Sequence, residues 1–368
     1  MSNPLEDLSA AGVSIWLDDL SRQRIRSGNL KSLVGDKNVV GVTTNPSIFQ
    51  AAMAKDDAYD EDIAKLAREG KSTEEVVRVL TASDVQEACE VLKPVWEKSN
   101  HVDGCVSLEV EPKLARDTEG TITQARELWA AVDRQNLFIK IPATAEGVPA
   151  IKQVLSEGIN VNVTLIFSLE RYEAVMEAYL SALEERVARG ESIDALNSVA
   201  SFFVSRVDSE VDKRLTGIGS DEAKALLGKA AVANARAAYE KYESVFDGPR
   251  WDALRQAGAH RQRPLWASTG VKNPDYADTM YVVDLVAGGV VNTMPEPTLD
   301  AVADHGVVTG DTITTNYASA HDVLSQLSTV GVDLAEVTEL LEVEGLEKFD
   351  TAWNDLLSGV NGKVEAAR

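Results

Sequence analysis

At 368 residues the chain is longer than the ~250 typical of a single (β/α)8 barrel, and its 44% hydrophobic and 26% charged residues are ordinary for a globular domain. A formal charge of −23 argues against non-specific binding to nucleic acid or to an anionic membrane, because both need a basic surface. The segment MSNPLEDLSA lacks the pattern of a signal peptide and no run of ~18 apolar residues is present, so we expect a cytoplasmic protein with no membrane partner.

Short β-like runs follow one another along the chain, and segments with helical periodicity separate them. The runs, in chain order, are SIWLDD (14–19), NVVGVTTN (38–45), GCVSLEVE (104–111), LFIKIPAT (137–144), NVNVTLIFS (160–168), SVASFFVSR (198–206), PLWAST (264–269) and VVNTM (290–294). Start and stop signals mark the helices between them. Ser72 and Glu75 form a capping box, and a helix capped at Ser168 ends at Gly190.

This alternation predicts the α/β class, either as a closed (β/α)8 TIM barrel or as an open, doubly wound sheet. The number of strand–helix units favours the barrel. The surplus length lies in three helical stretches, at 47–100, at 207–262 and in a C-terminal region from about 315 to 368. Without a linker, a low-complexity tract or a repeat, residues 1–368 are expected to form one barrel domain with helical additions.

Side-chain alternation along the strands predicts which polar groups face the barrel interior. Residues two apart share a face, and helices cover the apolar outer face of a barrel strand. The side chains expected to point inward on this ground are Ser107, Glu109 and Glu111 on one strand, and Asn160, Asn162 and Thr164 on another, opposite Val161, Val163 and Leu165. By the same parity Asp18, Asn45 and Lys140 lie late in their strands, so these groups converge on one mouth of the barrel.

Lys140 is the candidate nucleophile, because an unpaired charge inside an apolar strand is costly. A lone strand lysine is ordinarily a solvated strand end, but here two carboxylates and two carboxamides accompany it. Partial burial favours the neutral amine, which attacks a ketone to form a Schiff base. The imine permits carbon–carbon cleavage if one base removes the β-hydroxyl proton and a second acid/base handles the water of imine formation. Asp18 and Glu109 are the candidates for these two tasks.

Other chemistries have weaker support in the sequence. The four histidines, His101, His260, His305 and His321, are dispersed without ligand spacing, so no metal is expected. GIGSDE at 217–222 lacks the third glycine of a dinucleotide loop and is interpreted as a helix end followed by a new cap at Ser220 or Asp221. No nucleotide or other cofactor is therefore expected. The two cysteines, Cys89 and Cys105, are too few for a disulfide framework and fit a reducing compartment.

Five segments, each at the end of an expected strand and in a fixed order, together resemble transaldolase over about residues 13–300. They are TTNPS (43–47), SLEVE (107–111), FIKIPAT (138–144), NVTLIFS (162–168) and SFFVSR (201–206). The resemblance implies a class I aldolase-type barrel of the nonoxidative pentose phosphate pathway. Such a transferase moves a dihydroxyacetone unit from sedoheptulose 7-phosphate to glyceraldehyde 3-phosphate, giving erythrose 4-phosphate and fructose 6-phosphate.

The resemblance also implies roles for individual residues. Lys140 matches the Schiff-base lysine, Asp18 the acid/base of carbon–carbon cleavage, and Glu109 with Thr164 the pair that handles the water of imine formation. The implied substrate-binding residues are Asn45, Asn162, Ser201, Phe203 and the phosphate-binding Arg206.

The sequence departs from the family's pattern at two places. The first strand reads WLDDL, so the choice of Asp18 over Asp19 rests on parity with Trp16. After the seventh strand, ASTGVKN offers Ser268 and Lys272 where the family commonly has an arginine after a serine. A lysine binds phosphate as a point charge and loses the bidentate fork of arginine.

Two further functions stay open at this point. A lysine-dependent sugar-phosphate aldolase, similar to fructose 6-phosphate aldolase, would release free dihydroxyacetone, and a non-catalytic barrel would merely bind a sugar phosphate. The first differs from a transaldolase in how well water competes with the acceptor aldehyde, and the second predicts no covalent adduct. On every reading we expect sugar-phosphate ligands and a monomer or homodimer.

Overall fold

The computed structural model describes residues 3–55 and 57–368, and its strands form a closed, all-parallel barrel in chain order. Residues 1 and 2 of the N-terminal segment and residue 56 of the expected helical stretch 47–100 lie outside the described part. The strands are β1 (Ser14–Leu17), β2 (Val39–Val42), β3 (Cys105–Glu109), β4 (Leu137–Pro142), β5 (Val161–Ile166), β6 (Ser198–Phe203), β7 (Arg263–Ala267) and β8 (Val291–Met294). Because β1 pairs with β8, the barrel prediction is confirmed and the open sheet is wrong.

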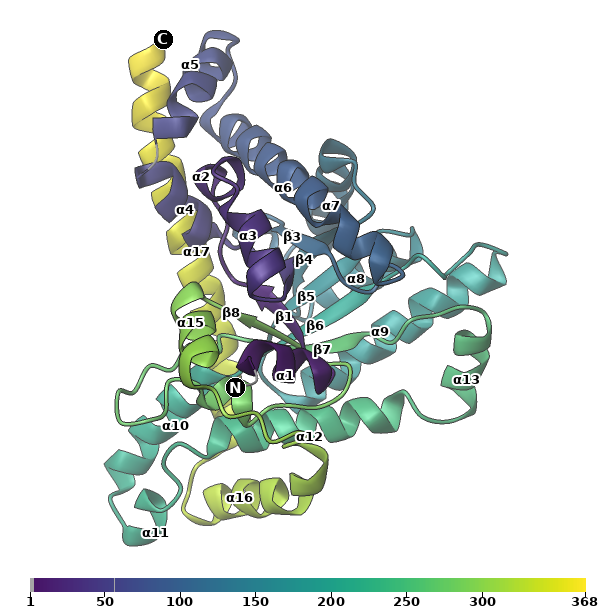
Figure 1. Cartoon of the computed structure of the whole chain (residues 1–368), viewed down its shortest axis with the longest axis vertical. Coiled ribbons are helices and arrows are strands. Elements are labelled where there is room, and N and C mark those ends of the chain that lie inside the picture. Colours follow the sequence, from purple (N-terminus) through teal and green to yellow (C-terminus); the bar gives the residue numbers. More distant parts are fainter. Residues whose placement is uncertain (1–2, 56) are drawn as a thin grey trace.

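Helices alternate with the strands and surround them (Figure 1). In the first half of the chain they are α1 (Pro4–Ala10), α2 (Arg22–Arg26), α3 (Asn29–Asp36), α4 (Pro46–Lys55), η1 (Asp57–Tyr59), α5 (Asp60–Arg68), α6 (Thr73–Lys98), η2 (Pro112–Leu114), α7 (Thr118–Val132), α8 (Gly147–Ser156) and α9 (Leu169–Ala188). In the second half they are α10 (Ser205–Ile218), α11 (Asp221–Lys224), α12 (Ala230–Val245), α13 (Pro249–Gln256), α14 (Met280–Val283), α15 (Glu296–His305), η3 (Thr314–Asn316), α16 (Tyr317–Thr329) and α17 (Leu334–Ala367).

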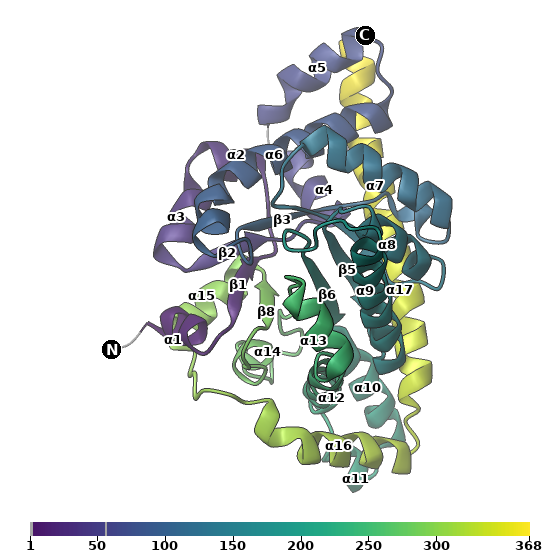
Figure 2. The ribbon, with the colours of Figure 1, turned by 90° about the vertical axis from the view of Figure 1, so that its right-hand side faces the viewer.

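The additional helices are arranged around the barrel in two places. Helix α16 packs on α12 below the barrel in the view of Figure 1, and the long α17 runs along one side of the molecule to end beside α5 (Figures 1 and 2). The three helical stretches expected from the sequence therefore contain α4–α6, α10–α13 and α16–α17.

The helix boundaries follow the capping signals of the sequence. The Ser72 hydroxyl accepts from the Glu75 amide at 3.2 Å while Glu75 Oε2 accepts from the Ser72 amide at 2.7 Å, which is the expected capping box. Within GIGSDE, Gly219 ends α10 at φ +73° and Ser220 caps α11. The interpretation of this segment as a helix end with a new cap is confirmed.

Large apolar side chains fill the barrel below its mouth. Trp16 of β1 and Phe138 of β4 meet edge to face with ring centroids 6.1 Å apart, and both are buried. Gly41 of β2 makes room for the indole, because a Cβ there would lie 2.4 Å from Trp16 Cε2. The candidate site residues therefore lie above this apolar layer, at the C-terminal mouth of the barrel, where barrel enzymes place their chemistry.

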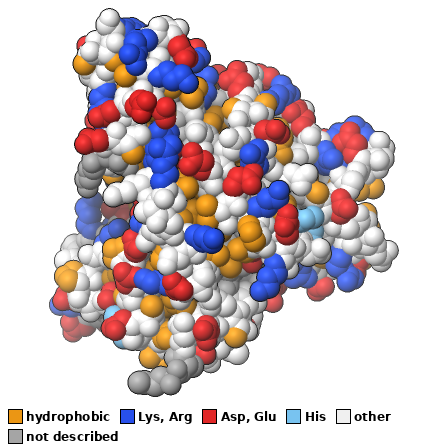
Figure 3. Space-filling model, turned by 45° about the horizontal axis from the view of Figure 1, so that its top comes forward, with side chains coloured by type: hydrophobic (Ala, Val, Ile, Leu, Met, Phe, Trp, Pro, Cys, Tyr) orange, Lys and Arg blue, Asp and Glu red, His pale blue; other side chains and the backbone are white. Residues whose placement is uncertain are grey.

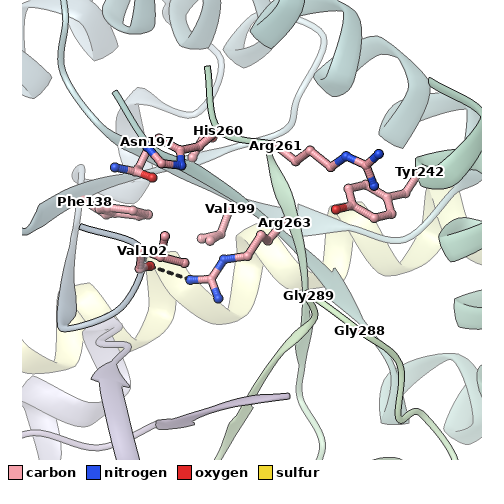
Figure 4. A pocket seen from close by; sticks show the side chains of 11 residues that line it. Val102, Phe138, Asn197, Val199, Tyr242, His260, Arg261, Arg263, Gly288 and Gly289 are labelled. Atoms are coloured by element: carbon pink, nitrogen blue, oxygen red, sulfur yellow. Dashed lines mark hydrogen bonds between the residues drawn. The ribbon is translucent and has the colours of Figure 1, made fainter. Parts of the chain in front are cut away.

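A cavity of about 280 Å³ lies at the opposite, N-terminal end of the barrel (Figure 4). Arg263 dominates one wall, where it donates to the Val102 carbonyl at 2.7 Å, to Asp103 at 3.0 Å and to the Ser14 hydroxyl at 2.7 Å. These bonds connect β7 to β1 and to the segment before β3, so Arg263 stabilises the N-terminal end of the barrel.

A buried ion pair joins α2 to α6. Arg22 Nε donates to Asp84 Oδ1 at 2.9 Å, and the Tyr59 hydroxyl donates to Asp84 Oδ2 at 2.7 Å. Arg22 and Asp84 are both buried, and Arg22 also pairs with Asp62 at 2.8 Å, so the Asp84 carboxylate depends on Arg22 for compensation of its charge.

The surface shown in Figure 3 carries acidic and basic side chains interspersed. Among the described helices, none is long and apolar enough to cross a membrane.

Candidate active site

Three polar side chains occupy neighbouring strands at one level of the barrel. In the register of the parallel sheet Glu109 of β3 pairs with Lys140 of β4, and Lys140 pairs with Asn162 of β5. All three point inward, because alternation sends their strand neighbours Ile139 and Ile141 outward against the helices. Thr164 lies two residues further along β5 and pairs with Pro142.

Lys140 is held by two oxygen acceptors. Its Nζ lies 3.2 Å from Glu109 Oε2 and 3.1 Å from the backbone carbonyl of Thr44. The Lys140 and Glu109 side chains are only 6% and 4% exposed, so the ammonium and the carboxylate compensate each other in a site with little water. The lone lysine of the apolar strand thus has a charge partner on the adjacent strand.

The two aspartates after β1 point to different places. Asp18 Oδ1 accepts a 2.7 Å hydrogen bond from the Thr43 hydroxyl, which lies 2.6 Å from the Thr293 hydroxyl of β8. Asp19 instead accepts from Arg24 at 2.6 Å on the outer side, and its side chain is 39% exposed. Asp18 is therefore the aspartate of this pair that faces the barrel interior.

Burial perturbs both interior carboxyl groups. It raises the pKa of Glu109 to about 7 against the opposing effect of the Lys140 charge, with Asp18 adding to the rise. Burial likewise raises the pKa of Asp18, opposed by Lys140 and by the Thr43 hydrogen bond. A carboxyl group with a pKa near 7 can give or take a proton at neutral pH, which suits an acid/base.

Orphaned polar atoms point to a ligand at this level. Glu109 Oε1 and Thr164 Oγ1 are buried, and within the described chain neither has a hydrogen-bond partner. Buried polar atoms are normally satisfied, so such an atom next to a nucleophile is a place for a substrate oxygen or a water. The Asn162 amide is already oriented, because its Nδ2 donates to Ser107 Oγ at 3.0 Å and its Oδ1 accepts from Ser201 at 2.7 Å.

Asn45 lies at the edge of the mouth, where it caps α4. Its Oδ1 accepts from the Ile48 amide at 3.1 Å, which leaves its amide nitrogen as a donor. Together with Arg206, Asn45 lines a cavity of about 800 Å³ between α4, α10 and α17. Most of the remaining wall of this cavity comes from α17.

Arg206 stands near the start of α10 with its Cζ 5.1 Å from the centre of the Phe203 ring. Its Nη1 is buried without a hydrogen-bond partner in the described chain, and burial lowers the pKa of the guanidinium. The Phe203 ring in turn packs on Phe167 at 5.2 Å. A desolvated guanidinium with a free donor at a cavity wall is suited to bind an anionic group.

Only part of the segment after β7 contacts the elements of the site. Ser268 adopts φ +55°, and its Oγ lies 2.9 Å from Ser205 Oγ at the start of α10, beside Arg206. Lys272 is exposed further along the same loop, and within the described chain it forms no ion pair with a residue of the mouth. The structure thus brings Ser268, but not Lys272, into contact with the elements of the site.

Two expectations from strand alternation are wrong. Glu111 lies beyond the end of β3, where the strand pattern stops, and it pairs with Arg78 and Lys113, each at 2.8 Å, outside the barrel. Leu165 adopts φ +58° where the β5–β6 register shifts, and its side chain lies against α17 instead of the outer helices. A simple alternation of inward and outward side chains does not predict where a strand ends or where it bulges.

Sequence reasoning missed two residues of the site. Thr43 bonds Asp18, and its place at the end of an expected strand in the TTNPS segment could have indicated this. Phe349 of α17 is buried with its ring centre 5.4 Å from Lys140 Nζ, and nothing in its helix marks it. In the described part of the chain no cluster of three or more His, Cys, Asp or Glu side chains has metal-binding geometry.

The chain is similar to known proteins over almost all of its length. The family model described as transaldolase/fructose-6-phosphate aldolase matches residues 15–360. A transaldolase of Thermobifida fusca (strain YX) is 59% identical over 366 residues, and one of Parafrankia sp. (strain EAN1pec) is 58% identical over 367, with all of both chains covered in each case. A transaldolase of Mycobacterium tuberculosis (strain ATCC 25618 / H37Rv) is 58% identical over 99% of this chain and 98% of its own.

Proposed function

The chain belongs to the transaldolase family and has transaldolase activity, and from this premise we propose that the mouth residues transfer a dihydroxyacetone unit between sugar phosphates through a Schiff base on Lys140. The observation that carries the assignment is the enclosed Lys140–Glu109 pair, since it sets an amine beside a carboxyl group whose pKa is about 7. Glu109 is placed to accept a proton from Nζ and so to free the amine as a nucleophile.

The first half of the reaction forms the covalent intermediate. The Lys140 amine attacks the C2 carbonyl carbon of the ketose phosphate, and the resulting carbinolamine loses water to give a protonated imine. Glu109 supplies the proton that lets the hydroxyl leave as water, and the unpaired Thr164 hydroxyl offers that water a second hydrogen-bond partner. The unsatisfied Glu109 Oε1 supports this role, because the leaving water needs a polar partner there.

The second half breaks and remakes a carbon–carbon bond. Asp18 removes the proton of the C4 hydroxyl, the C3–C4 bond breaks, and its electron pair moves into the imine to leave an enamine on Lys140 and a free aldehyde. The enamine then attacks the carbonyl carbon of the acceptor, and Asp18 returns the proton to the new hydroxyl. One water hydrolyses the resulting imine, which releases the product ketose phosphate and the Lys140 amine. The 2.7 Å bond from Thr43 holds the Asp18 carboxylate in place for both transfers.

The other mouth residues are proposed to bind the substrate. Asn45 and Asn162, oriented by the hydrogen bonds described above, bind sugar hydroxyls beside Ser201 and Phe203. Arg206 binds the phosphate, with Ser268 at the neighbouring loop end and Lys272 as a weaker second cation. The buried free cysteines Cys89 and Cys105 support a location in the reducing cytoplasm.

Trapping the intermediate tests the proposal. The protein is mixed with fructose 6-phosphate, reduced with borohydride, digested and mapped by mass spectrometry. We expect a single reduced adduct on the peptide that contains Lys140. An adduct on another lysine, or no adduct in a protein that turns over fructose 6-phosphate, would overturn the assignment.

A further inference from the structure

Helix α17 crosses the mouth of the barrel. It packs against α4, η2 and α10, which follow the C-terminal ends of β2, β3 and β6, and against β5 itself. Its buried side follows a helical stripe made of Val337, Leu341, Gly345, Phe349, Leu356, Val360 and Val364. The middle of this stripe lies over the site, whereas its C-terminal part continues along α4 and α5 (Figures 1 and 2).

Gly345 lets the helix approach the mouth closely. A Cβ at this position would lie 3.0 Å from Leu165 Cδ2 and 3.4 Å from Arg206 Nη1. A glycine within a helix costs about 1 kcal/mol relative to alanine, so close contact with the neighbouring groups is the physical reason to have it here. The contact fixes the height of α17 above β5 and α10.

Phe349 follows Gly345 by one helical turn and forms the roof over the candidate nucleophile. Its side chain is 6% exposed, and its ring centre is 5.4 Å from Lys140 Nζ. Glu109, Asn162 and Thr44 surround Lys140 on the other sides with polar groups, whereas the phenyl ring offers no proton and no acceptor. The ring therefore covers this side of Nζ with an apolar surface.

We propose that Phe349 is a specificity-determining residue that protects the enamine on Lys140 from water. The close packing of Gly345 against Leu165 and Arg206 holds the ring in this position. The inference rests on the proposed Schiff-base function. After cleavage the enamine has two fates: it attacks an acceptor aldehyde, or it takes a proton at carbon and the resulting imine is hydrolysed by one water to free dihydroxyacetone and the Lys140 amine. Excluding water suppresses the second fate and leaves the first.

The test compares two alanine variants of α17 in the full-length protein. Phe349→Ala opens the roof, and Leu356→Ala removes a buried side chain of the same stripe further along the helix. For each protein one measures free dihydroxyacetone released from fructose 6-phosphate without acceptor, and erythrose 4-phosphate consumed in its presence. We expect Phe349→Ala to raise the ratio of release to transfer on the order of tenfold, equivalent to ~1.4 kcal/mol between the two barriers, and Leu356→Ala to keep the original ratio.

Borohydride trapping separates this inference from the function on which it rests. An unchanged ratio in a Phe349→Ala protein that still gives the Lys140 adduct overturns the role of Phe349 and leaves the Schiff base in place. A native protein without the adduct overturns the function itself. If Phe349→Ala does not fold, Phe349→Leu decides in its place. It keeps an apolar side chain but uncovers part of Nζ, so a smaller rise in the ratio is expected, and an unchanged ratio overturns the role of Phe349.

Discussion

Lys140 and Glu109 form an ion pair in which both side chains are almost fully enclosed, with Nζ 3.2 Å from Oε2. Neither charge has a bulk-water shell to replace its partner, so each of the two charges depends on the other. Of the two acceptors of Nζ, the Thr44 carbonyl and the Glu109 carboxylate, only the carboxylate is a base that can take a proton from the ammonium. The pair is therefore both the structural solution for a buried lysine and the proposed starting point of the reaction.

Replacing the nucleophile should abolish activity without unfolding the barrel. Lys140→Ala deletes the amine, and Lys140→Arg retains a cation that stays protonated and cannot attack a carbonyl. We expect both variants to lack the borohydride adduct, measured by intact mass with fructose 6-phosphate. Lys152→Ala, which changes a half-buried lysine on α8 that pairs with Glu185, is the control and should retain the adduct. Turnover by the arginine variant would contradict the mechanism.

The two interior carboxyl groups should fail at different steps. Asp18→Asn keeps the bond from Thr43 but cannot accept the C4 hydroxyl proton, so the imine should form and accumulate. Glu109→Gln should slow the formation of the adduct itself. Each loss in rate should be on the order of 10²-fold or more, as is typical of positioned acids and bases. Single-turnover mixing followed by a borohydride quench measures both, and accumulation in Asp19→Asn but not in Asp18→Asn would move the base to Asp19.

Protein stability should depend on pH through Glu109. Its pKa is about 7 in the folded protein and near its ordinary value of 4.5 in the unfolded chain, so between these values the folded state binds the extra proton. The stabilisation is complete below pH 4.5 and is lost as pH rises through 7, by at most ~1.4 kcal/mol per pH unit. Denaturant unfolding from pH 5 to pH 8 should show a smaller decline for Glu109→Gln than for the native protein. Parallel declines would show that Glu109 does not titrate in this range.

Removing the Arg206 guanidinium should weaken the binding of phosphorylated substrates more than that of unphosphorylated ones. The negative field of the protein opposes a dianion, so Arg206 must act at short range, and Arg206→Gln should raise KM far more for phosphorylated than for unphosphorylated donors. Lys272→Ala should give the same pattern more weakly, because this side chain is exposed. Arg214→Gln, on the same helix but paired with Glu210, serves as the control. Equal effects on both kinds of donor would make Arg206 a structural residue.

The buried pair between α2 and α6 should matter for stability alone. Arg22→Met leaves the Asp84 carboxylate buried with only Tyr59 as a partner, and loss of one partner of a buried pair typically costs ~3–5 kcal/mol. The double change Arg22→Met with Asp84→Leu should recover most of that loss, since both charges are then gone. Thermal and denaturant unfolding measure this, and a single variant as stable as the native protein would contradict it.

Strand positions were predictable because each strand is a short apolar or alternating run between helices with clear caps. The inward direction of Glu109, Lys140 and Asn162 followed from the same alternation, since all three lie inside regular strands. The directions of Leu165 and Glu111 were predicted wrongly, because a bulge at Leu165 and the end of β3 before Glu111 interrupt the alternation. Phe349 could not be anticipated, since its approach to Lys140 depends on where a long amphipathic helix crosses the barrel and periodicity does not encode that.

The pairing of β1 with β8 has a consequence for the order in which the protein folds. These strands come from residues 14–17 and 291–294, and contacts so distant in sequence form slowly because the loop entropy is lost before the contact stabilises. The hydroxyl chain from Asp18 through Thr43 to Thr293 spans this seam. The bond from Thr43 to Asp18 needs only the neighbouring strands β1 and β2, whereas the contact of the Thr43 hydroxyl with Thr293 can form only once β8 closes the barrel.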